Sequence, residues 1–231
     1  MKQYNGEKAI ISLTSWKARI NTVGLTLFSL VKRCPGFHIV LVLSEEEFPK
    51  KEAELPDTVM AFVDQDLIEI LWVYKNYKSF KKVLFTMDKY KDVPVISADD
   101  DLIYPINYAQ VLYNVWKTHP TNCIGYTHSY RNNKYKTKIL WGYAQLFPPR
   151  FSRLIDFKLL DVLLMKNCID DDDFYAAIRH KYNVTPISLN IPYKSWIIPI
   201  KSINKSTSIT SQRKSHTPDM TIYNALLGTN L

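Results

Sequence analysis

The first half of the chain alternates short apolar runs with amphipathic segments, and this alternation restricts the folds that it can adopt. Runs that read as buried strands occupy residues 8–13, 37–43, 58–63, 68–73 and 93–97. Segments with helical patterning lie between them, at about 22–33 and 79–90. Short apolar runs separated by helical segments are typical of a parallel sheet covered on both faces. We therefore predict an α/β fold with a central, mostly parallel sheet flanked by helices.

The second half continues this pattern and then changes character. We expect further elements in this order: a helix at 107–118, a strand at 122–127, a basic loop or hairpin at 131–138, a short apolar segment at 143–149, helices to about 181 and a strand at 184–189. Residues 201–219 are rich in Ser, Thr and Lys and show no periodicity. The sequence thus predicts one domain over 1–189 and an irregular basic tail over 190–231, which is a candidate lid or a contact for membrane or acceptor.

Composition narrows the class of protein. Of the 231 residues, 46% are hydrophobic and 23% are charged, which suits a globular domain with a full core. Three widely spaced cysteines without a CxxC pair favour a reducing compartment. We find neither a signal peptide nor an apolar run of the roughly 20 residues that span a bilayer, so we expect a cytoplasmic protein. The net charge of +8 favours partners that carry phosphate.

Three consecutive carboxylates, Asp99 to Asp101, follow the expected strand at 93–97. Like charges repel, so such a run needs a cation or full solvation. In extended backbone Asp99 and Asp101 point to one side, where they can hold Mg²⁺ or Mn²⁺ together with the oxygens of a diphosphate. In parallel sheets ligands bind at this carboxyl end of the strands. A solvated turn with Asp101 capping the next helix is the alternative.

A second acidic run, Asp170 to Asp173, precedes an expected helix. Acids at a helix N-terminus gain about 0.3–1 kcal/mol each from the helix dipole, which accounts for two of the four. A carboxylate crowded by like charges has a raised pKa, as a general base needs. One acidic run suited to metal and one suited to proton transfer together indicate transfer from a diphosphate donor.

Basic and hydroxyl side chains lie where a phosphate or nucleotide would need them. Lys81 or Lys82 can reach a phosphate from the segment that leads into the aspartate strand. Thr14, Ser15 and Arg19 follow the first strand at the same sheet edge. His216 in the tail is a candidate third metal ligand, with a solvated histidine as the alternative. The chain has six glycines and neither a GxGxxG nor a GxxxxGK[ST] loop, which favours phosphate binding through a metal.

Several stretches, in this order, resemble bacterial glycosyltransferases of the GT-A fold, of the kind encoded in capsule and lipopolysaccharide gene clusters. They are ISLTSWKARI, LVLSEEEFP, YKSFKKVLFTMDKYKDVPVISADDDLIYP, LFPPRF and DDDFYAAI. The third stretch contains the D-x-D motif, and the resemblance covers roughly residues 8–185.

The resemblance implies a nucleotide-sugar donor, most often a UDP-sugar, a saccharide or lipid-linked acceptor, and Mn²⁺ or Mg²⁺. It places Thr14, Ser15, Arg19, Lys81, Asp99 and Asp100 at the nucleotide-sugar, and Asp99 and Asp101 at the metal. It also places Asp172 and Asp173 at the acceptor hydroxyl, with Asp173 favoured as general base and Asp172 as the alternative. On this interpretation we also expect an inverting transfer and no nucleic-acid partner. We further expect a peripheral contact with the cytoplasmic face of the inner membrane.

Two other functions compete with it. A sugar nucleotidyltransferase also needs paired acids on such a sheet, although most carry a glycine-rich loop after the first strand, where this chain has TSWKARINTVG. A non-catalytic module that binds polyanions or membranes would use the basic charge and leave both acidic runs as solvated caps.

Overall fold

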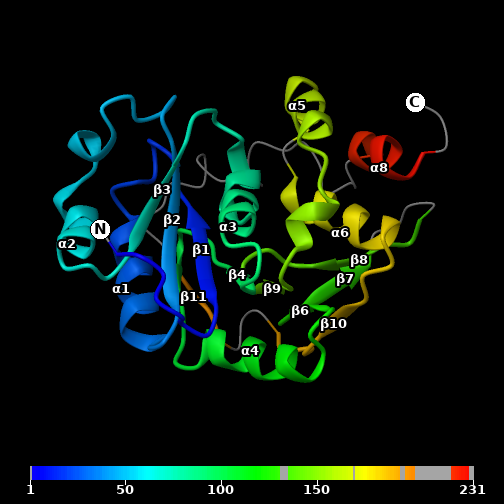
Figure 1. Cartoon of the computed structure of the whole chain (residues 1–231), viewed down its shortest axis with the longest axis horizontal. Helices are drawn as coiled ribbons and strands as arrows, with labels where there is room; N and C mark the ends of the chain where they lie inside the picture. Colours follow the sequence, from blue (N-terminus) through cyan, green and yellow to red (C-terminus); the bar gives the residue numbers. More distant parts are fainter. Residues whose placement is uncertain (1, 131–134, 169, 193–195, 201–219, 229–231) are drawn as a thin grey trace.

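The computed structural model describes residues 2–130, 135–168, 170–192, 196–200 and 220–228, and within these residues a seven-stranded sheet forms the centre of the molecule (Figure 1). In spatial order its strands are β10 (Pro186–Ser188), β6 (Cys123–Gly125), β9 (Gln145–Phe147), β4 (Val95–Ser97), β1 (Ile10–Thr14), β2 (His38–Ser44) and β3 (Glu69–Val73). Two short ribbons join β5 (Leu102–Ile103) to β11 (Ile198–Pro199) and β7 (His128–Tyr130) to β8 (Lys138–Leu140).

The sheet is mostly parallel. Strand β1 pairs in parallel with β2 and β4, β2 pairs in parallel with β3, and β10 pairs in parallel with β6. Strand β9 runs antiparallel to both of its neighbours, β4 and β6. The predicted fold class, a central and mostly parallel sheet flanked by helices, is confirmed.

Helices cover both faces of the sheet (Figure 1). The helices α1 (Val23–Arg33), α2 (Asp57–Asp64) and α4 (Tyr108–Thr118) contribute to one core. The helices α3 (Leu84–Lys89), α5 (Phe157–Met165), α6 (Asp171–Lys181) and α8 (Met220–Leu227) contribute to the other. Short 3₁₀ segments are η1 (Lys51–Glu54), η2 (Lys78–Lys82) and η3 (Phe151–Leu154). Of the described helices, none has the length and apolar character that a bilayer crossing requires.

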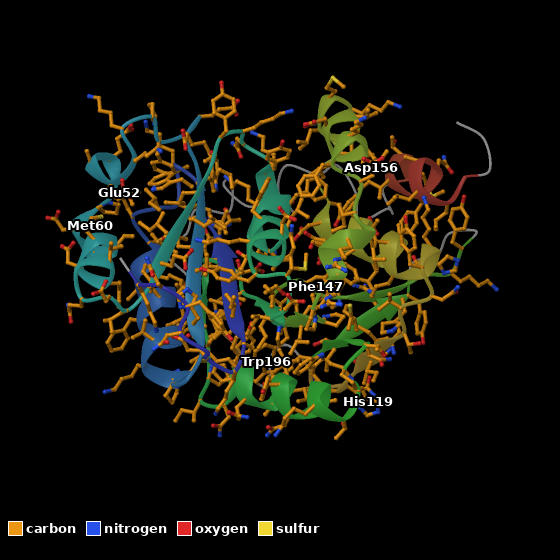
Figure 2. All side chains as sticks on the ribbon, in the orientation of Figure 1. Glu52, Met60, His119, Phe147, Asp156 and Trp196 are labelled. Atoms are coloured by element: carbon orange, nitrogen blue, oxygen red, sulfur yellow. The ribbon has the colours of Figure 1, made fainter. Side chains whose placement is uncertain are left out.

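Strand side chains alternate between the two cores, as the pleat of a strand demands. In β2, Ile39 and Leu41 enter the first core, whereas Val40 and Val42 enter the second. Figure 2 labels Trp196 beside α4 and Phe147 among the helices of the opposite face. The ring of Trp196 stacks on Tyr108 in the first core. Central strands are therefore apolar on both faces, which is why their runs were recognisable in the sequence.

The predicted strand at 58–63 is wrong, because this segment forms α2. Val59 and Val63, one helical turn apart, are the residues of α2 that are buried. Pro56 precedes the helix and Asp57 lies in its first turn, and both are favourable there. A short apolar run does not by itself distinguish a strand from a buried helix. The expected helix at 79–90 is divided into η2 and α3, with Val83 between them.

The C-terminal segment, predicted to be irregular, contains a helix. Ile222, Tyr223 and Leu226 of α8 are buried in the second core, and β11 pairs with β5. Residues 201–219, for which a mobile tail was predicted, lie outside the described residues. The division at 189/190 stays a prediction.

The central position of β1 predicts a large loss of stability when its core is truncated. Ile11 is fully buried in β1, so the substitution Ile11→Ala should lower the free energy of unfolding by about 2–5 kcal/mol. Leu25→Ala is the control, because Leu25 is 54% exposed on α1 and should change stability by about 0.5 kcal/mol at most. Urea unfolding of both variants measures the difference, and equal values would contradict the placement of β1.

Candidate functional site

The strand order of the sheet reverses at β1, whose neighbours are β2 on one side and β4 on the other. Ligands of parallel α/β sheets bind at the carboxyl edge of such a switch point. The segment after β1 carries Ser15 and Arg19, and the segment after β4 carries Asp99 to Asp101. The fold thus brings the two predicted groups together at this edge.

Asp100 and Asp101 share one guanidinium group. An Arg19 nitrogen lies 2.8 Å from Asp100 Oδ1 and 2.5 Å from Asp101 Oδ2. Ser15 donates a hydrogen bond of 2.6 Å to Asp100 Oδ2, and Thr26 of α1 donates one of 2.9 Å to the Asp100 carbonyl oxygen. Residues 100 and 101 form a turn, so Asp100 does not point away from Asp101 as simple alternation predicts. Ser15 and Arg19, predicted at the nucleotide, hold this turn.

Thr14 and Lys81 contact β2 and the loop that follows it. The Thr14 hydroxyl donates to the Val42 carbonyl oxygen at 2.7 Å. Lys81 is almost fully buried, and its Nζ lies 2.6 Å from Glu47 Oε2. Burial lowers the pKa of Lys81 although Glu47 acts in the opposite direction. The predicted reach of Lys81 to a phosphate therefore requires its release from Glu47.

Lys82, not Lys81, joins the two acidic runs. Its Nζ lies 2.7 Å from Asp99 Oδ1 and 3.1 Å from Asp171 Oδ2. Burial opposes the charge of Lys82, but the carboxylates of Asp171, Asp99 and Asp172 outweigh it and raise the pKa of Lys82 well above its usual value. From the sequence, either Lys81 or Lys82 was expected to reach the site. Adjacent residues of a 3₁₀ helix point in different directions, so the pattern alone could not assign their partners.

The aspartates in and before the first turn of α6 point in different directions and contact different groups. Asp170 caps the helix, and its Oδ1 accepts a hydrogen bond of 3.1 Å from the Asp173 backbone N–H. Asp173 is fully buried, and its Oδ1 accepts a hydrogen bond of 3.0 Å from the Tyr223 hydroxyl in α8. Asp173, predicted as general base, thus faces α8, whereas Asp171 faces Lys82.

Asp172 is the partly exposed member of the run from Asp170 to Asp173. Burial and the charges of Asp171 and Asp170 raise the pKa of Asp172 well above its usual value, although Lys82 acts in the opposite direction. Burial also raises the pKa of Asp171, against the effect of Lys82. A partly accessible carboxylate with a raised pKa has the character of a general base.

Gly142 packs directly against these charges and was not selected as a site residue from the sequence. Its backbone N–H donates a hydrogen bond of 2.8 Å to Asp172 Oδ1. A Cβ atom at this position would lie 2.8 Å from the same oxygen and 3.2 Å from Lys82 Nζ. Only glycine lets the backbone approach the acids this closely.

Asp99 and Asp101, the predicted metal ligands, offer carboxylate oxygens at the aspartate turn, where they pair with Lys82 and Arg19. Their side chains are 31% and 32% exposed. Burial and the nearby charge of Asp99 raise the pKa of Asp101, against the effect of Arg19. Within the described ranges, no three His, Cys, Asp or Glu side chains are arranged to hold a metal. The remaining ligands would have to come from a bound molecule, as Mg²⁺ often requires. His216 lies outside the described residues.

A cavity of about 460 Å³ with a mixed polar and apolar lining opens near the ends of β2 and β3. It is lined by Glu46, Glu47, Lys75, Asn76, Lys78, Leu164, Met165 and Asn167. Glu47 therefore connects the cavity wall to Lys81. The charged and amide groups of this lining can contact a polar ligand.

Comparison with known proteins identifies solved structures with a similar fold. No protein-family model and no curated protein matches the sequence. A mannosyltransferase from Pyrobaculum calidifontis, solved with GDP-Man and Mn²⁺, matches with a TM-score of 0.52 and 12% identity over 79% of this chain and 54% of its own. A 4-diphosphocytidyl-2C-methyl-D-erythritol synthase matches with a TM-score of 0.51 and 14% identity over 82% of this chain and 92% of its own. This chain spans about half the length of the mannosyltransferase, and it shares the fold of both proteins.

The burial of Asp100 predicts a pH-dependent contribution to stability. Burial raises the pKa of Asp100 to about 6, against the effects of Arg19 and Ser15. In the unfolded chain the value is about 3.9, so the folded state binds more protons between these values, and stability falls as the pH rises through them. The variant Asp100→Asn has no carboxyl proton to release at this position and should not show this fall in stability.

The difference in the free energy of unfolding between Asp100→Asn and wild type should therefore change by about 2–3 kcal/mol in favour of the variant as the pH rises from 4 to 7. Urea unfolding across this range, without divalent metal, measures the gain. Asp88→Asn, which replaces a 50% exposed aspartate outside both acidic runs, is the control for the change of residue type. A difference between Asp100→Asn and wild type that does not vary with pH would contradict the assignment.

Proposed function

We propose that this chain is a glycosyltransferase that moves a sugar from a nucleoside-diphosphate sugar to a hydroxyl group of a saccharide or lipid-linked acceptor. The observation that carries the proposal is the junction at Lys82, which brings the aspartate turn after β4 into contact with the acidic turn of α6. One side of this junction suits a metal-bound diphosphate, and the other suits a general base. Such a pair is what displacement at a sugar carbon requires.

The donor side is assigned to Asp99 and Asp101. These carboxylates would hold Mn²⁺ or Mg²⁺ against the diphosphate, and the cation would supply charge that stabilises the leaving group. Arg19 keeps Asp100 and Asp101 in their turn. The mannosyltransferase solved with GDP-Man and Mn²⁺ supports this choice of ligand through its shared fold. The base of the nucleotide is left to experiment, with UDP as the expectation.

The acceptor side is assigned to Asp172. In the proposed step its carboxylate takes the proton of the acceptor hydroxyl while that oxygen forms a bond to the anomeric carbon. The bond from this carbon to the diphosphate oxygen breaks, and its electron pair leaves with the nucleoside diphosphate. Asp172 is preferred to Asp173 because it is partly exposed, whereas Asp173 is fully buried against Tyr223. Lys82 keeps the two acidic groups together without repulsion.

A nucleotidyltransferase is the second candidate, favoured by the 92% of the synthase chain that this chain covers. The two activities release different products. A glycosyltransferase releases a nucleoside diphosphate from a sugar nucleotide, whereas a nucleotidyltransferase releases pyrophosphate from a nucleoside triphosphate and a phosphorylated substrate. Assaying both products with the same preparation discriminates between them.

The donor assignment predicts metal-dependent nucleotide binding. Calorimetric titration with UDP, GDP and CDP, with and without Mn²⁺, should show one of them binding in the presence of the metal. Asp101→Ala should weaken this binding by about 10–100-fold, because it removes a ligand of the cation. Asp88→Ala, at an exposed carboxylate of α3 outside both acidic runs, should bind as wild type does. Failure of all three nucleotides with Mn²⁺ present would contradict the donor site.

The base assignment predicts the effect of Asp172→Asn. This variant should lower kcat by about 10²–10⁴-fold and leave the affinity for the donor nucleotide unchanged, because a general base acts in the transition state. The kcat of wild type should rise with pH as Asp172 loses its proton, at a pH well above the usual range of an aspartate. Asp172→Asn should lose this dependence. A variant with wild-type kcat would return the assignment to Asp173.

A further inference from the structure

The hydroxyl group of Tyr223 lies in a buried chain of hydrogen bonds behind the acidic turn. It donates to Asp173 Oδ1 at 3.0 Å and accepts from the Thr137 hydroxyl at 2.8 Å. Tyr223 and Asp173 are fully buried, and Thr137 is 2% exposed. The three residues come from α8, α6 and the segment before β8, so the chain joins three elements. Because the Thr137 proton points at the phenol oxygen, the phenol proton is directed to Asp173.

This chain acts on the turn that carries the proposed general base. The Asp173 backbone N–H bonds to the Asp170 carboxylate and thereby closes the cap of α6. Asp172 is adjacent to Asp173 in this turn, and its own carboxylate is held from the opposite side by the Gly142 N–H. The turn is thus fixed on one side by Gly142 and on the other by Tyr223.

The space around Asp172 makes its position sensitive to small movements. The Gly142 N–H already lies at hydrogen-bond distance, 2.8 Å, from Asp172 Oδ1, so the turn cannot move closer to Gly142. Loss of the Tyr223 proton would leave the fully buried Asp173 carboxylate with one donor fewer, which is costly for a buried charge. The turn would then relax in the other direction, away from the acceptor side of the site.

We propose that Tyr223 is a positioning residue: through Asp173 it holds the first turn of α6, and with it Asp172, in the geometry for proton removal from the acceptor. The C-terminal helix α8 is therefore part of the working site and not an appendage. Figure 1 shows α8 beside α6, on the side of the molecule opposite to α1 and α2. Tyr223 transfers no proton, and its role rests on the proposed function of Asp172.

Tyr223→Phe removes the hydroxyl and keeps the ring, which stacks on Tyr135 at an interplanar angle of 21°. We expect this variant to lower kcat about 10–100-fold, with the donor KM within about twofold of wild type, because displacement of a reacting group by 1 Å can cost about 10²-fold. Thr137→Val keeps Tyr223 and removes the donor that orients it. It should lower kcat in the same direction by a smaller factor.

Tyr90→Phe is the matched control. The Tyr90 hydroxyl donates to Glu69 Oε2 at 2.5 Å, so the control also removes a bond between a phenol and a carboxylate. Glu69 is the first residue of β3 and its carboxylate also lies 2.6 Å from His38 at the start of β2, so this bond shares no residue with the acidic turns. We expect Tyr90→Phe to lower Tm as Tyr223→Phe does, and to leave kcat unchanged. Equal kcat values in Tyr223→Phe and wild type would overturn the proposal.

Amide hydrogen exchange tests the same proposal without substrate. In Tyr223→Phe the amides of Asp173 and Phe174, which donate to the carboxylate and the carbonyl of Asp170, should exchange at least about tenfold faster, whereas those of β1 and β4 should be unchanged. Tyr90→Phe should leave the exchange of α6 at its wild-type rate. Unchanged exchange in α6 of Tyr223→Phe would overturn the proposal. If wild type showed no transferase activity, the proposed function would fail, and the exchange rates would still decide whether Tyr223 holds the turn.

Discussion

The ammonium group of Lys82 is the contact on which the geometry of the site depends. It lies between carboxylates of two segments that are far apart in the chain, Asp99 after β4 and Asp171 in α6. Without a cation, burial of these acids next to one another would be prohibitive. Arg19 solves the same problem for Asp100 and Asp101. Two largely buried cations thus allow this concentration of acids.

The sheet explains why these groups meet. The order reversal at β1 opens the carboxyl edge between the exits of β1 and β4, and the aspartate turn lies there. Strand β9 runs antiparallel to its neighbours, so the chain enters it from this same edge and places Gly142 against Asp172. The N-terminus of α6 faces the same point, and α8 fixes its far side through Tyr223. The acids are therefore held by the Gly142 backbone N–H, the Tyr223 hydroxyl and the Lys82 ammonium group.

Several elements could be predicted from local pattern, and the exceptions have physical causes. β1 and β2 were recognisable because both of their faces are buried, which makes each run continuously apolar. The segment 58–63 has an equally apolar run, but it packs one stripe against the core as α2, and this difference is set by its neighbours. Helix α8 is a short, mostly apolar segment after a long polar stretch, and only its packing against α6 and the second core gives it a defined place.

By itself the sequence determined the α/β class, the two acidic runs and their place at strand and helix ends, because burial periodicity and charge are local properties. Only the tertiary structure decided which residue of each run does what. Lys81 pairs with Glu47 and Lys82 with the aspartates, and Asp172 stays partly exposed whereas Asp173 turns to Tyr223. A sequence pattern cannot distinguish adjacent residues of the same type. They differ once the helix directs each of them to a different neighbour, and those neighbours come from distant parts of the chain.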